Sequence, residues 1–482
     1  MKLTDATLHA LPDVVATPDY DRQQNQIGIV HLGPGAFFRA HQAWYTDRAL
    51  EKGGDWGICA VALNSNRVKT QLAPQQGLYT LGEIDRVTHF RVIGAVKEVL
   101  ALKEDFDLVI QRLTAIGTKI VTMTITEKGY SLNAKGRLNR QDKVIQSDLQ
   151  NYQQPSSAIG LLFLACQLRY QKGISPLSLI SCDNLSDNGH KLKQALVDYA
   201  FEIDPTLAEY IELHVICPST MVDSITPATD DKFVQQIAEL GYEDNWPIKR
   251  ESFSQWVIED ILPADIPAWA EVGVTFTDDV SGYENAKLRV LNATHSTLAY
   301  LGAYLGIETV LDAIEQPNIN GFINTMLKEE ITPSFAAPVD MDIQQYCDSI
   351  VARYHNPAIR HLLAQIAWDG SQKLPMRLLP VIEANLALGN GIQKCCLALA
   401  AWMRFIVNKQ QQGTELVDPL AESLLAIAEQ CQNDESDVAR FLALDMFNAD
   451  WANHADFINA VTSSYKLLVS HEQQNTRQQI LA

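Results

Sequence analysis

Three polar side chains, Lys287, Asn292 and His295, stand close together in the segment YENAKLRVLNATHS (283–296). On an α-helix with 3.6 residues per turn they would lie within an arc of about 140°, with Glu284 one turn before Lys287 on the same side. A lysine whose pKa falls from about 10.4 towards 7–8 can give a proton to a carbonyl oxygen or take one from a hydroxyl. The spacing is therefore compatible with interconversion of a ketone and a secondary alcohol, with Lys287 moving the proton.

The polar neighbours of Lys287 fit the same chemistry. Asn292, with Asn184 from an earlier segment, would donate hydrogen bonds to the reacting oxygen as it gains negative charge. His295 would orient the substrate hydroxyl or carbonyl. The alternative is a solvated helix in which Glu284 and Lys287 form an ion pair and the histidine is only hydrogen-bonded. Spacing alone leaves both open.

A glycine turn near the N-terminus is typical of nucleotide binding. The β-branched run 27–32 leads into Gly33-Pro34-Gly35, and Ala36 and Phe37 would begin a helix. A strand, a glycine turn and a helix N-terminus bring backbone N–H groups against a pyrophosphate. The third glycine of the usual G-x-G-x-x-G pattern is replaced by Phe38, so an ordinary turn is the alternative.

The residues after the second expected strand leave the choice of nucleotide open. The run 56–63 ends in Asn64-Ser65-Asn66-Arg67, without the carboxylate that usually holds the ribose hydroxyls of NAD. Asn64 can still bond a ribose hydroxyl, whereas Arg67 can meet a 2′-phosphate. NAD is the expected cofactor, and NADP is not excluded.

Polar residues follow three further runs that resemble strands. They are Thr126 and Glu127 after the third run, Asn184 after the fourth, and Asp223 beyond residue 218. Ligands of open α/β sheets bind at the carboxyl ends of strands, which favours one site for these residues. Turns and helix caps are the alternative explanation for each cluster taken alone.

The pattern along the chain predicts two domains. Residues 27–32, 56–63, 119–126, 177–182 and 214–217 are expected strands, separated by helical stretches, which predicts a parallel α/β sheet. Beyond about residue 280 only helical periodicity appears, with 394–407 and 419–430 as helices and 407–418 as a loop. We therefore expect a Rossmann-like N-terminal domain over 1–280 and a mostly α-helical domain over 281–482.

Composition and charge exclude several classes of binding partner. The 482 residues are 47% hydrophobic, and 58 acidic against 38 basic residues give a formal charge of −20. Such a surface repels nucleic acid and anionic lipid, and an anionic substrate would need local cations. The eleven histidines form no H-E-x-x-H pattern, so no metal is expected. With no signal-peptide pattern and no membrane-length apolar run, the cytoplasm is the expected location.

Several segments together resemble the long-chain mannitol dehydrogenase family. They are GPGAFFRAHQAWY (33–45), TITEKGY (124–130), SCDNLSDNGH (181–190), PSTMVDSITPAT (218–229), QWVIED (255–260) and YENAKLRVLNATHS (283–296). The resemblance implies that Lys287 is the acid and base, that Asn184 and Asn292 polarise the oxygen, and that His295 binds substrate. It further implies that Asp223 contacts substrate and that Glu284 gates proton exchange with solvent.

The segment ARYHNPAIRHLLAQIAWDGSQKLPMRLL (352–379) is more similar to the fructuronate reductase branch than to the mannitol branch. Where mannitol-type members are expected to carry an arginine, this chain has Lys373, which with Arg377 can meet a carboxylate. The implied reaction is interconversion of D-fructuronate and D-mannonate with NAD(H). The alternatives are a polyol dehydrogenase, a tagaturonate reductase or a nucleotide sensor without catalysis. Either a monomer or a small homo-oligomer is expected.

Overall fold

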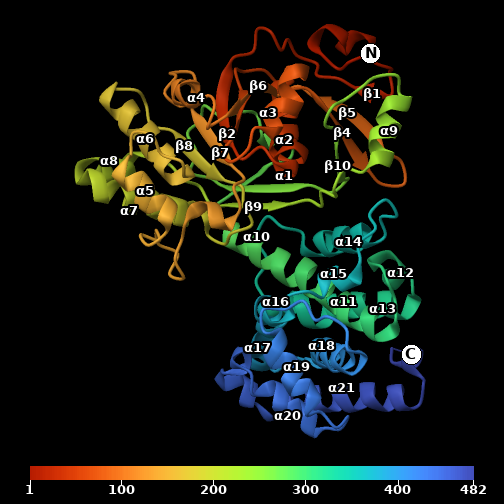
Figure 1. Cartoon of the computed structure of the whole chain (residues 1–482). Coiled ribbons are helices and arrows are strands. Elements are labelled where there is room, and N and C mark those ends of the chain that lie inside the picture. Colours follow the sequence, from red (N-terminus) through yellow and green to blue (C-terminus); the bar gives the residue numbers. More distant parts are fainter. Residues whose placement is uncertain (482) are drawn as a thin grey trace. The chain divides into compact units, whose positions relative to one another are not determined.

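The structure, a computed structural model, describes residues 1–481, and its chain divides into two units, Met1–Ser281 and Gly282–Ala482 (Figure 1). The first unit contains all the strands of the described chain, and the second is built from helices. The expected α/β unit followed by a mostly helical unit is confirmed. Each unit is described separately below.

Five parallel strands form the main sheet of the first unit. Their spatial order is β6-β3-β2-β7-β8. The sheet's first strand, β2, is therefore central, and the chain adds β3 and β6 on one side before β7 and β8 on the other. This is the strand order of a Rossmann dinucleotide-binding sheet. The strands are β2 (Ile27–Leu32), β3 (Gly57–Ala62), β6 (Val96–Ala101), β7 (Ile120–Met123) and β8 (Ser178–Ser181).

The central strands are apolar on both faces because helices cover both. On β2, Val30 and Leu32 face a core shared with α4, α6 and α7, whereas Ile29 faces a second core shared with α1 and α2. A strand buried on both faces reads as a continuous hydrophobic run rather than an alternating one. The helices are α1 (Ala36–Ala40), α2 (Gln42–Leu50), α3 (Arg67–Leu72), α4 (Phe106–Leu113), α5 (Lys143–Gln150), α6 (Ala158–Gln171), α7 (Asn188–Ile203), α8 (Pro205–His214) and α9 (Asp231–Glu239).

The prediction of a strand over 214–217 is wrong. His214 ends α8, and the segment makes one parallel bridge beside β8, where the Leu179 N–H donates to the Ile216 carbonyl over 2.8 Å. Pro218 directly follows the segment and has no N–H to donate to a ladder, so a sixth strand does not extend here.

Two smaller sheets of the first unit were not predicted. A four-stranded sheet has the order β1-β5-β4-β10, and a three-stranded sheet has the order β12-β11-β9. Their strands are short, and several mix polar with apolar residues, which weakens the periodic signal. They are β1 (Val15–Ala16), β4 (Tyr79–Ile84), β5 (His89–Ile93), β9 (Thr220–Asp223), β10 (Ile248–Glu251), β11 (Gln255–Glu259) and β12 (Thr275–Thr277).

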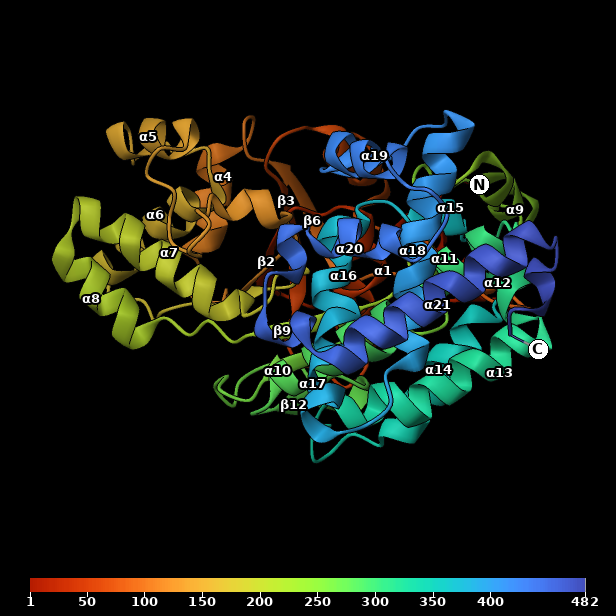
Figure 2. The ribbon, with the colours of Figure 1, turned by 90° about the horizontal axis from the view of Figure 1, so that it is seen from below.

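The second unit is centred on α11 (Ala293–Leu305), α18 (Gln393–Gln412) and α21 (Ala455–Gln473), which lie side by side in Figures 1 and 2. Its buried α11 carries apolar residues nearly all round, as a helix enclosed by others must. The other helices are α12 (Val310–Ile314), α13 (Pro317–Met326), α14 (Ile343–Tyr354), α15 (Leu363–Ile366), α16 (Gly370–Arg377), α17 (Leu379–Leu388), α19 (Ala421–Glu429) and α20 (Ser436–Leu442), and α10 (Val280–Ala286) joins the units.

The loop expected over 407–418 begins too early. α18 continues through the glutamine run to Gln412, because glutamine is a good helix former on an exposed surface. Gly413, at φ +62°, then ends the helix in the left-handed conformation that glycine adopts without strain.

Candidate active site

The turn between β2 and α1 requires glycine and leaves its backbone open. Gly33 has φ +85°, and a Cβ there would lie 2.3 Å from the carbonyl oxygen of Thr124. Gly35 precedes α1 and is exposed, and a Cβ there would meet no atom closer than 3.9 Å. Ala36 is exposed and Phe37 half-buried. These features fit a pyrophosphate that approaches the backbone.

Phe38 stands at the position of the missing third glycine, and the structure shows what replaces that glycine. Its ring stacks on the His31 ring of β2, with the centroids 3.6 Å apart and the planes 13° apart. His31 in turn contacts Thr122 and Thr124 through its two ring nitrogens, at 2.8 and 3.1 Å. Burial lowers the pKa of His31 to about 3, so its ring is neutral. An aromatic stack therefore fixes the helix against the strand.

The predicted cofactor residue Thr126 has a strained backbone conformation. Its φ of +64° with ψ of 161° lies in a region that β-branched residues rarely enter. Asp183 holds this backbone, because its carboxylate accepts hydrogen bonds from the N–H groups of Ile125 and Thr126 at 2.9 and 2.8 Å. Such strain is retained where the surrounding structure fixes it, often at ligand sites.

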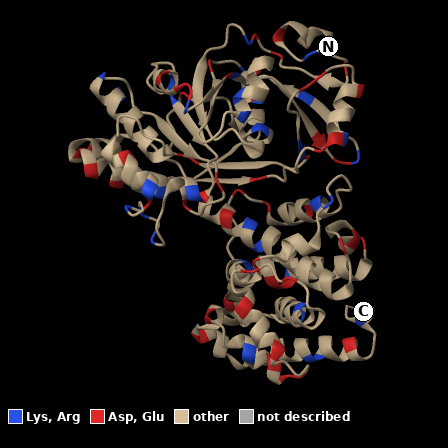
Figure 3. Ribbon diagram, viewed as in Figure 1, with Lys and Arg blue, Asp and Glu red and all other residues tan. Residues whose placement is uncertain are grey.

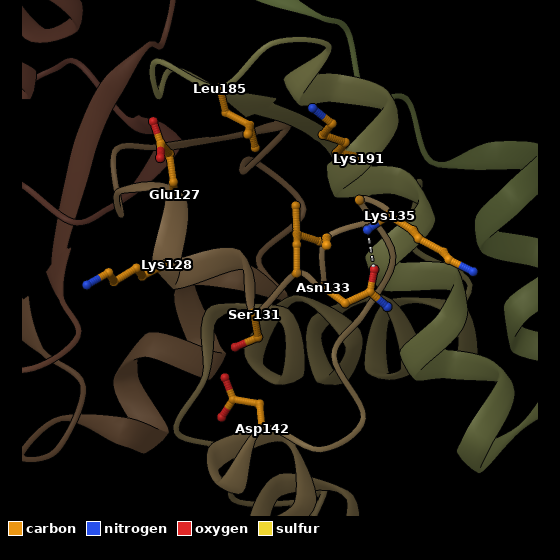
Figure 4. A pocket seen from close by; sticks show the side chains of 11 residues that line it. Glu127, Lys128, Ser131, Asn133, Lys135, Asp142, Leu185 and Lys191 are labelled. Atoms are coloured by element: carbon orange, nitrogen blue, oxygen red, sulfur yellow. Dashed lines mark hydrogen bonds between the residues drawn. The ribbon is translucent and has the colours of Figure 1, made fainter. Parts of the chain in front are cut away.

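A cavity of about 720 Å³ opens beside this turn (Figure 4). Glu127 and Lys128 lie on one side of it, and Lys135 and Lys191 on the other. Leu185, which follows β8, also lines it. The cavity therefore lies at the carboxyl ends of β7 and β8, where α/β sheets bind ligands.

Asn184 and Asp223 belong to neighbouring parts of the first unit. Asn184 is exposed directly after Asp183, whereas Asp223 is buried at the end of β9. Asn188 ties the two segments together, since its Nδ2 donates to the Thr220 carbonyl at 3.0 Å and its Oδ1 accepts from the Thr220 N–H at 2.8 Å.

The sequence suggested a regular α-helix around Lys287, but the structure shows an irregular one. Residues Lys287–Asn292 form a π-helical segment between α10 and α11. A π-helix bonds residue i to residue i+5, so Lys287 and Asn292 share one side of the helix instead of being about 140° apart. His295 lies three residues further on the same side of α11. The widened turn thus gathers the three residues more closely than an α-helix would.

Side chains satisfy the backbone at the end of the π-helical segment. The Leu291 carbonyl accepts hydrogen bonds from Thr294 Oγ1 at 3.1 Å and from the Tyr354 hydroxyl at 3.0 Å. Thr294 also donates to the Val290 carbonyl at 2.6 Å. These bonds satisfy carbonyl groups at the end of the segment, and π-helical turns are frequently found at functional sites.

His295 is held as a neutral ring with one unsatisfied nitrogen. Its ring stacks on Tyr354, at 5.6 Å between centroids, and meets the His361 ring edge-on at 4.6 Å. Burial, followed by His361 and nearby cations, lowers the pKa of His295 well below 6.5. Its Nε2 is buried without a hydrogen-bond partner among the described residues. Such an atom is costly to leave unpaired, which points to a ligand hydroxyl or carbonyl.

Three cations lie near enough to this imidazole to affect its charge. Arg353, Lys373 and Arg377 all lower the pKa of His295. Burial and then Arg377 lower the pKa of Lys373, whose Nζ donates to the Ile366 carbonyl at 3.3 Å. The chain has many more acidic than basic residues, which are scattered along both units in Figure 3. The three cations are the local cation group that an anionic substrate would need.

The predicted site residues therefore fall into two sets. Gly33, Gly35, Ala36, Phe37, Asn64, Thr126, Glu127, Asn184 and Asp223 belong to the first unit, and Glu284, Lys287, Asn292, His295 and Lys373 to the second. Glu284 and Lys287 are each half-buried.

Sequence reasoning gave no role to Arg353, Tyr354 or His361. All three lie in the segment 352–379, whose resemblance to a known family was the available signal. Their distance in sequence from His295 hides the contact, because α14 and the loop after it pack against α11 and the π-helical segment only in the folded unit.

Within residues 1–481, no group of three or more His, Cys, Asp and Glu side chains is placed to hold a metal ion. No helix in that range is long and apolar enough to cross a membrane.

Two family models together match most of the chain. Residues 27–271 match the mannitol dehydrogenase Rossmann domain, and residues 279–469 match the mannitol dehydrogenase C-terminal domain.

Known proteins resemble the chain over its full extent. D-mannonate oxidoreductase of Escherichia coli is 39% identical over 94% of this chain and 96% of that protein. A substrate-free D-sorbitol dehydrogenase structure is 30% identical and superimposes with a TM-score of 0.92, covering both chains fully. A ternary complex of Pseudomonas fluorescens mannitol 2-dehydrogenase with NAD and D-mannitol is 33% identical, with a TM-score of 0.79 over 100% of this chain and 99% of that one.

Proposed function

The chain belongs to the mannitol dehydrogenase family of oxidoreductases, and from that premise we propose that it interconverts D-fructuronate and D-mannonate. The observation that carries this choice of substrate is the group of three cations around the neutral His295. D-mannonate oxidoreductase, a relative at 39% identity, acts on the same class of sugar acid by its name.

The cations explain why a sugar acid is favoured over a neutral sugar. A carboxylate paired with Lys373 or Arg377 gains a charge-assisted hydrogen bond, worth about 1.5–3 kcal/mol, or roughly 10- to 150-fold in affinity. Burial and then Arg377 lower the pKa of Lys373. Asp369 and Asp418 offset only part of that effect, since the pKa of Lys373 is lowered overall. A neutral ketose would leave the repulsion between Arg377 and Lys373 in place.

The proton passes through Lys287. In the reductive direction its ammonium gives a proton to the ketone oxygen as the carbonyl carbon becomes a secondary alcohol carbon. Asn292, on the same side of the π-helical segment, donates a hydrogen bond to that oxygen, and Asn184 is the second donor. Glu284, in the preceding turn, exchanges the proton with solvent. The oxidative direction reverses each transfer.

Neutral His295 binds the substrate through its unpartnered Nε2. A neutral ring presents either a donor or an acceptor there, so it can bond a hydroxyl or a carbonyl oxygen. Asp223, buried at the end of β9, is the further substrate residue from the first unit.

NAD is the cofactor, and the nicotinamide supplies or takes the hydride. The open backbone at Gly33 and Gly35 fits its pyrophosphate, with Ala36 and Phe37 at the start of the helix. Asn64, Thr126 and Glu127 complete the proposed cofactor contacts from the ends of β3 and β7. Gly33 is confined by the Thr124 carbonyl, so the turn keeps this shape.

A neutral polyol is the second candidate substrate. Solved structures that superimpose closely on this chain include a sorbitol dehydrogenase and a mannitol 2-dehydrogenase. The isomeric uronate D-tagaturonate is a third candidate, because it carries the same carboxylate.

The decisive assay measures NADH oxidation with D-fructuronate, D-tagaturonate and D-fructose side by side. We expect the highest kcat/KM with D-fructuronate. Activity on D-fructose alone would reject the sugar-acid assignment, and activity on D-tagaturonate alone would assign the other isomer. Activity on none of these sugars, with NADH still bound, would instead favour a nucleotide sensor.

A further inference from the structure

Another, smaller cavity of the first unit lies where β3 and β6 end. Its volume is about 260 Å³. Asn64, Ser65 and Asn66, which follow β3, line one part, and Lys103 and Glu104, which follow β6, line another. The strands are neighbours in the sheet, and the Leu102 N–H donates to the Ala62 carbonyl at 2.9 Å where they end.

The position of this cavity is that of a ribose site. In Rossmann sheets the residue at the end of the second strand holds the ribose hydroxyls of the adenosine half, usually through a carboxylate. β3 is the second strand of this sheet, and asparagine and serine follow it instead. Glu104 brings a carboxylate to the same cavity from the adjacent strand.

Glu104 is oriented by two donors. Asn66 Nδ2 donates to one carboxylate oxygen at 2.8 Å, and Lys69 Nζ donates to the other at 3.2 Å. The bond from Asn66, with that from Lys69, lowers the pKa of Glu104, so the side chain is charged. A carboxylate accepts about four hydrogen bonds, so capacity remains for two hydroxyls.

Two of the three cations near Glu104 are already engaged, which leaves little free positive charge for a 2′-phosphate. Lys69 is already paired with Asp105, at 2.6 and 2.8 Å from the two carboxylate oxygens, so it adds no free positive charge. Arg67, the cation that the sequence offered for a phosphate, lies over the Trp246 ring at 5.6 Å from its centroid. Lys103, which also lines the cavity, is the exposed lysine that is left for a phosphate.

We propose that Glu104 accepts the hydroxyls of the adenosine ribose and thereby selects NAD against NADP. The carboxylate missing from the end of β3 is supplied by the turn after β6. This proposal rests on the proposed function only in requiring that the chain bind a nicotinamide dinucleotide.

Fluorescence titration of NADH and NADPH, without any sugar, tests the proposal on the wild type and on Glu104→Gln. We expect the wild type to prefer NADH. Because a bond to a charged acceptor is lost, Glu104→Gln should weaken NADH binding about tenfold or more. NADPH binding should be unchanged or tighter. Equal effects on both cofactors, no effect on either, or a wild type that prefers NADPH would overturn the assignment.

The matched control is Asp107→Asn, which removes one exposed carboxylate from the first turn of α4, outside the cavity. It should leave the affinities for NADH and NADPH unchanged. A loss of NADH affinity equal to that of Glu104→Gln would show that the effect comes from the overall charge of the protein, and would overturn the proposal. An error in the substrate assignment leaves this experiment intact, because no sugar is present. A wild type that binds neither nucleotide would overturn this proposal and the proposed function together.

Discussion

Arg377 donates a hydrogen bond from Nη1 to Ser296 Oγ over 3.0 Å, which ties α16 to the residue directly after His295. The bond holds a guanidinium beside the imidazole in a unit whose other acidic and basic residues are spread along its helices. Two groups with different proposed tasks, one for a substrate oxygen and one for a carboxylate, are therefore fixed relative to each other.

Ser296→Ala tests whether this bond positions Arg377. Loss of one neutral hydroxyl partner is worth about 0.5–1.5 kcal/mol. We expect KM for D-fructuronate to rise about two- to tenfold, with kcat changed less. Ser349→Ala is the control, because its hydroxyl bonds only locally to the Tyr346 carbonyl. An equal rise in KM for D-fructose would assign the serine a general structural role.

Lys373→Met tests where the carboxylate binds. The change keeps much of the side-chain volume but removes the charge, so kcat/KM for D-fructuronate should fall about 10- to 100-fold while that for D-fructose changes little. Lys328→Met, which removes an exposed lysine of the same unit, should change neither. Equal losses on both sugars in steady-state assays would place the carboxylate elsewhere.

Much of the fold follows from the sequence, because β2, β3, β7 and β8 are apolar runs between helical stretches. The two small sheets do not follow, since strands such as β10 (Ile248–Glu251) mix charged and apolar residues and are defined by distant partners. The strand predicted over 214–217 is wrong for the opposite reason. Its composition suits a strand, yet Pro218 and the end of α8 limit it to a single bridge.

Parts of the site were also beyond sequence reasoning. The π-helical segment has no sequence signal, since it depends on Thr294 and on Tyr354 from another helix. Likewise, the contacts of His295 with His361 and of Glu104 with Asn66 join residues that lie far apart in sequence. Lys373 was found because a resemblance to a known family directed attention to its segment.

Stability should fall as the solution is acidified below about pH 6.5. Burial holds the pKa of His31 at about 3 and lowers those of His295 and His361, whereas all three return to about 6.5 when unfolded. Below pH 6.5 the unfolded chain therefore binds protons that the native chain does not, and each group costs up to about 1.4 kcal/mol per pH unit.

Urea unfolding at pH 7.5 and 5.5 measures this loss. His361→Gln removes one of the three groups and one of the causes that lower the pKa of His295. The difference in unfolding free energy between the two pH values should therefore shrink. An identical difference in wild type and variant would show that His361 does not stay neutral when folded.

Two glycine variants separate folding from cofactor binding. Gly33→Ala places a Cβ 2.3 Å from the Thr124 carbonyl oxygen at a positive φ, which should cost roughly 1–3 kcal/mol of stability. Gly35 has an ordinary φ of −75°, and a Cβ there would enter open space. Gly35→Ala should therefore keep the wild-type melting temperature while NADH binding weakens. Thermal melts and NADH titrations measure both. Equal melting temperatures for the two variants would contradict the strain at Gly33.

The central claim is that Lys287 supplies the proton to the substrate oxygen. Its most direct test is kcat of Lys287→Ala, measured with NADH and whichever of the three sugars the wild type reduces fastest. We expect kcat to fall by at least about 10²-fold, because general acid–base groups contribute roughly 10²–10⁴. NADH affinity should stay at its wild-type value. Turnover within a few-fold of wild type would contradict the claim.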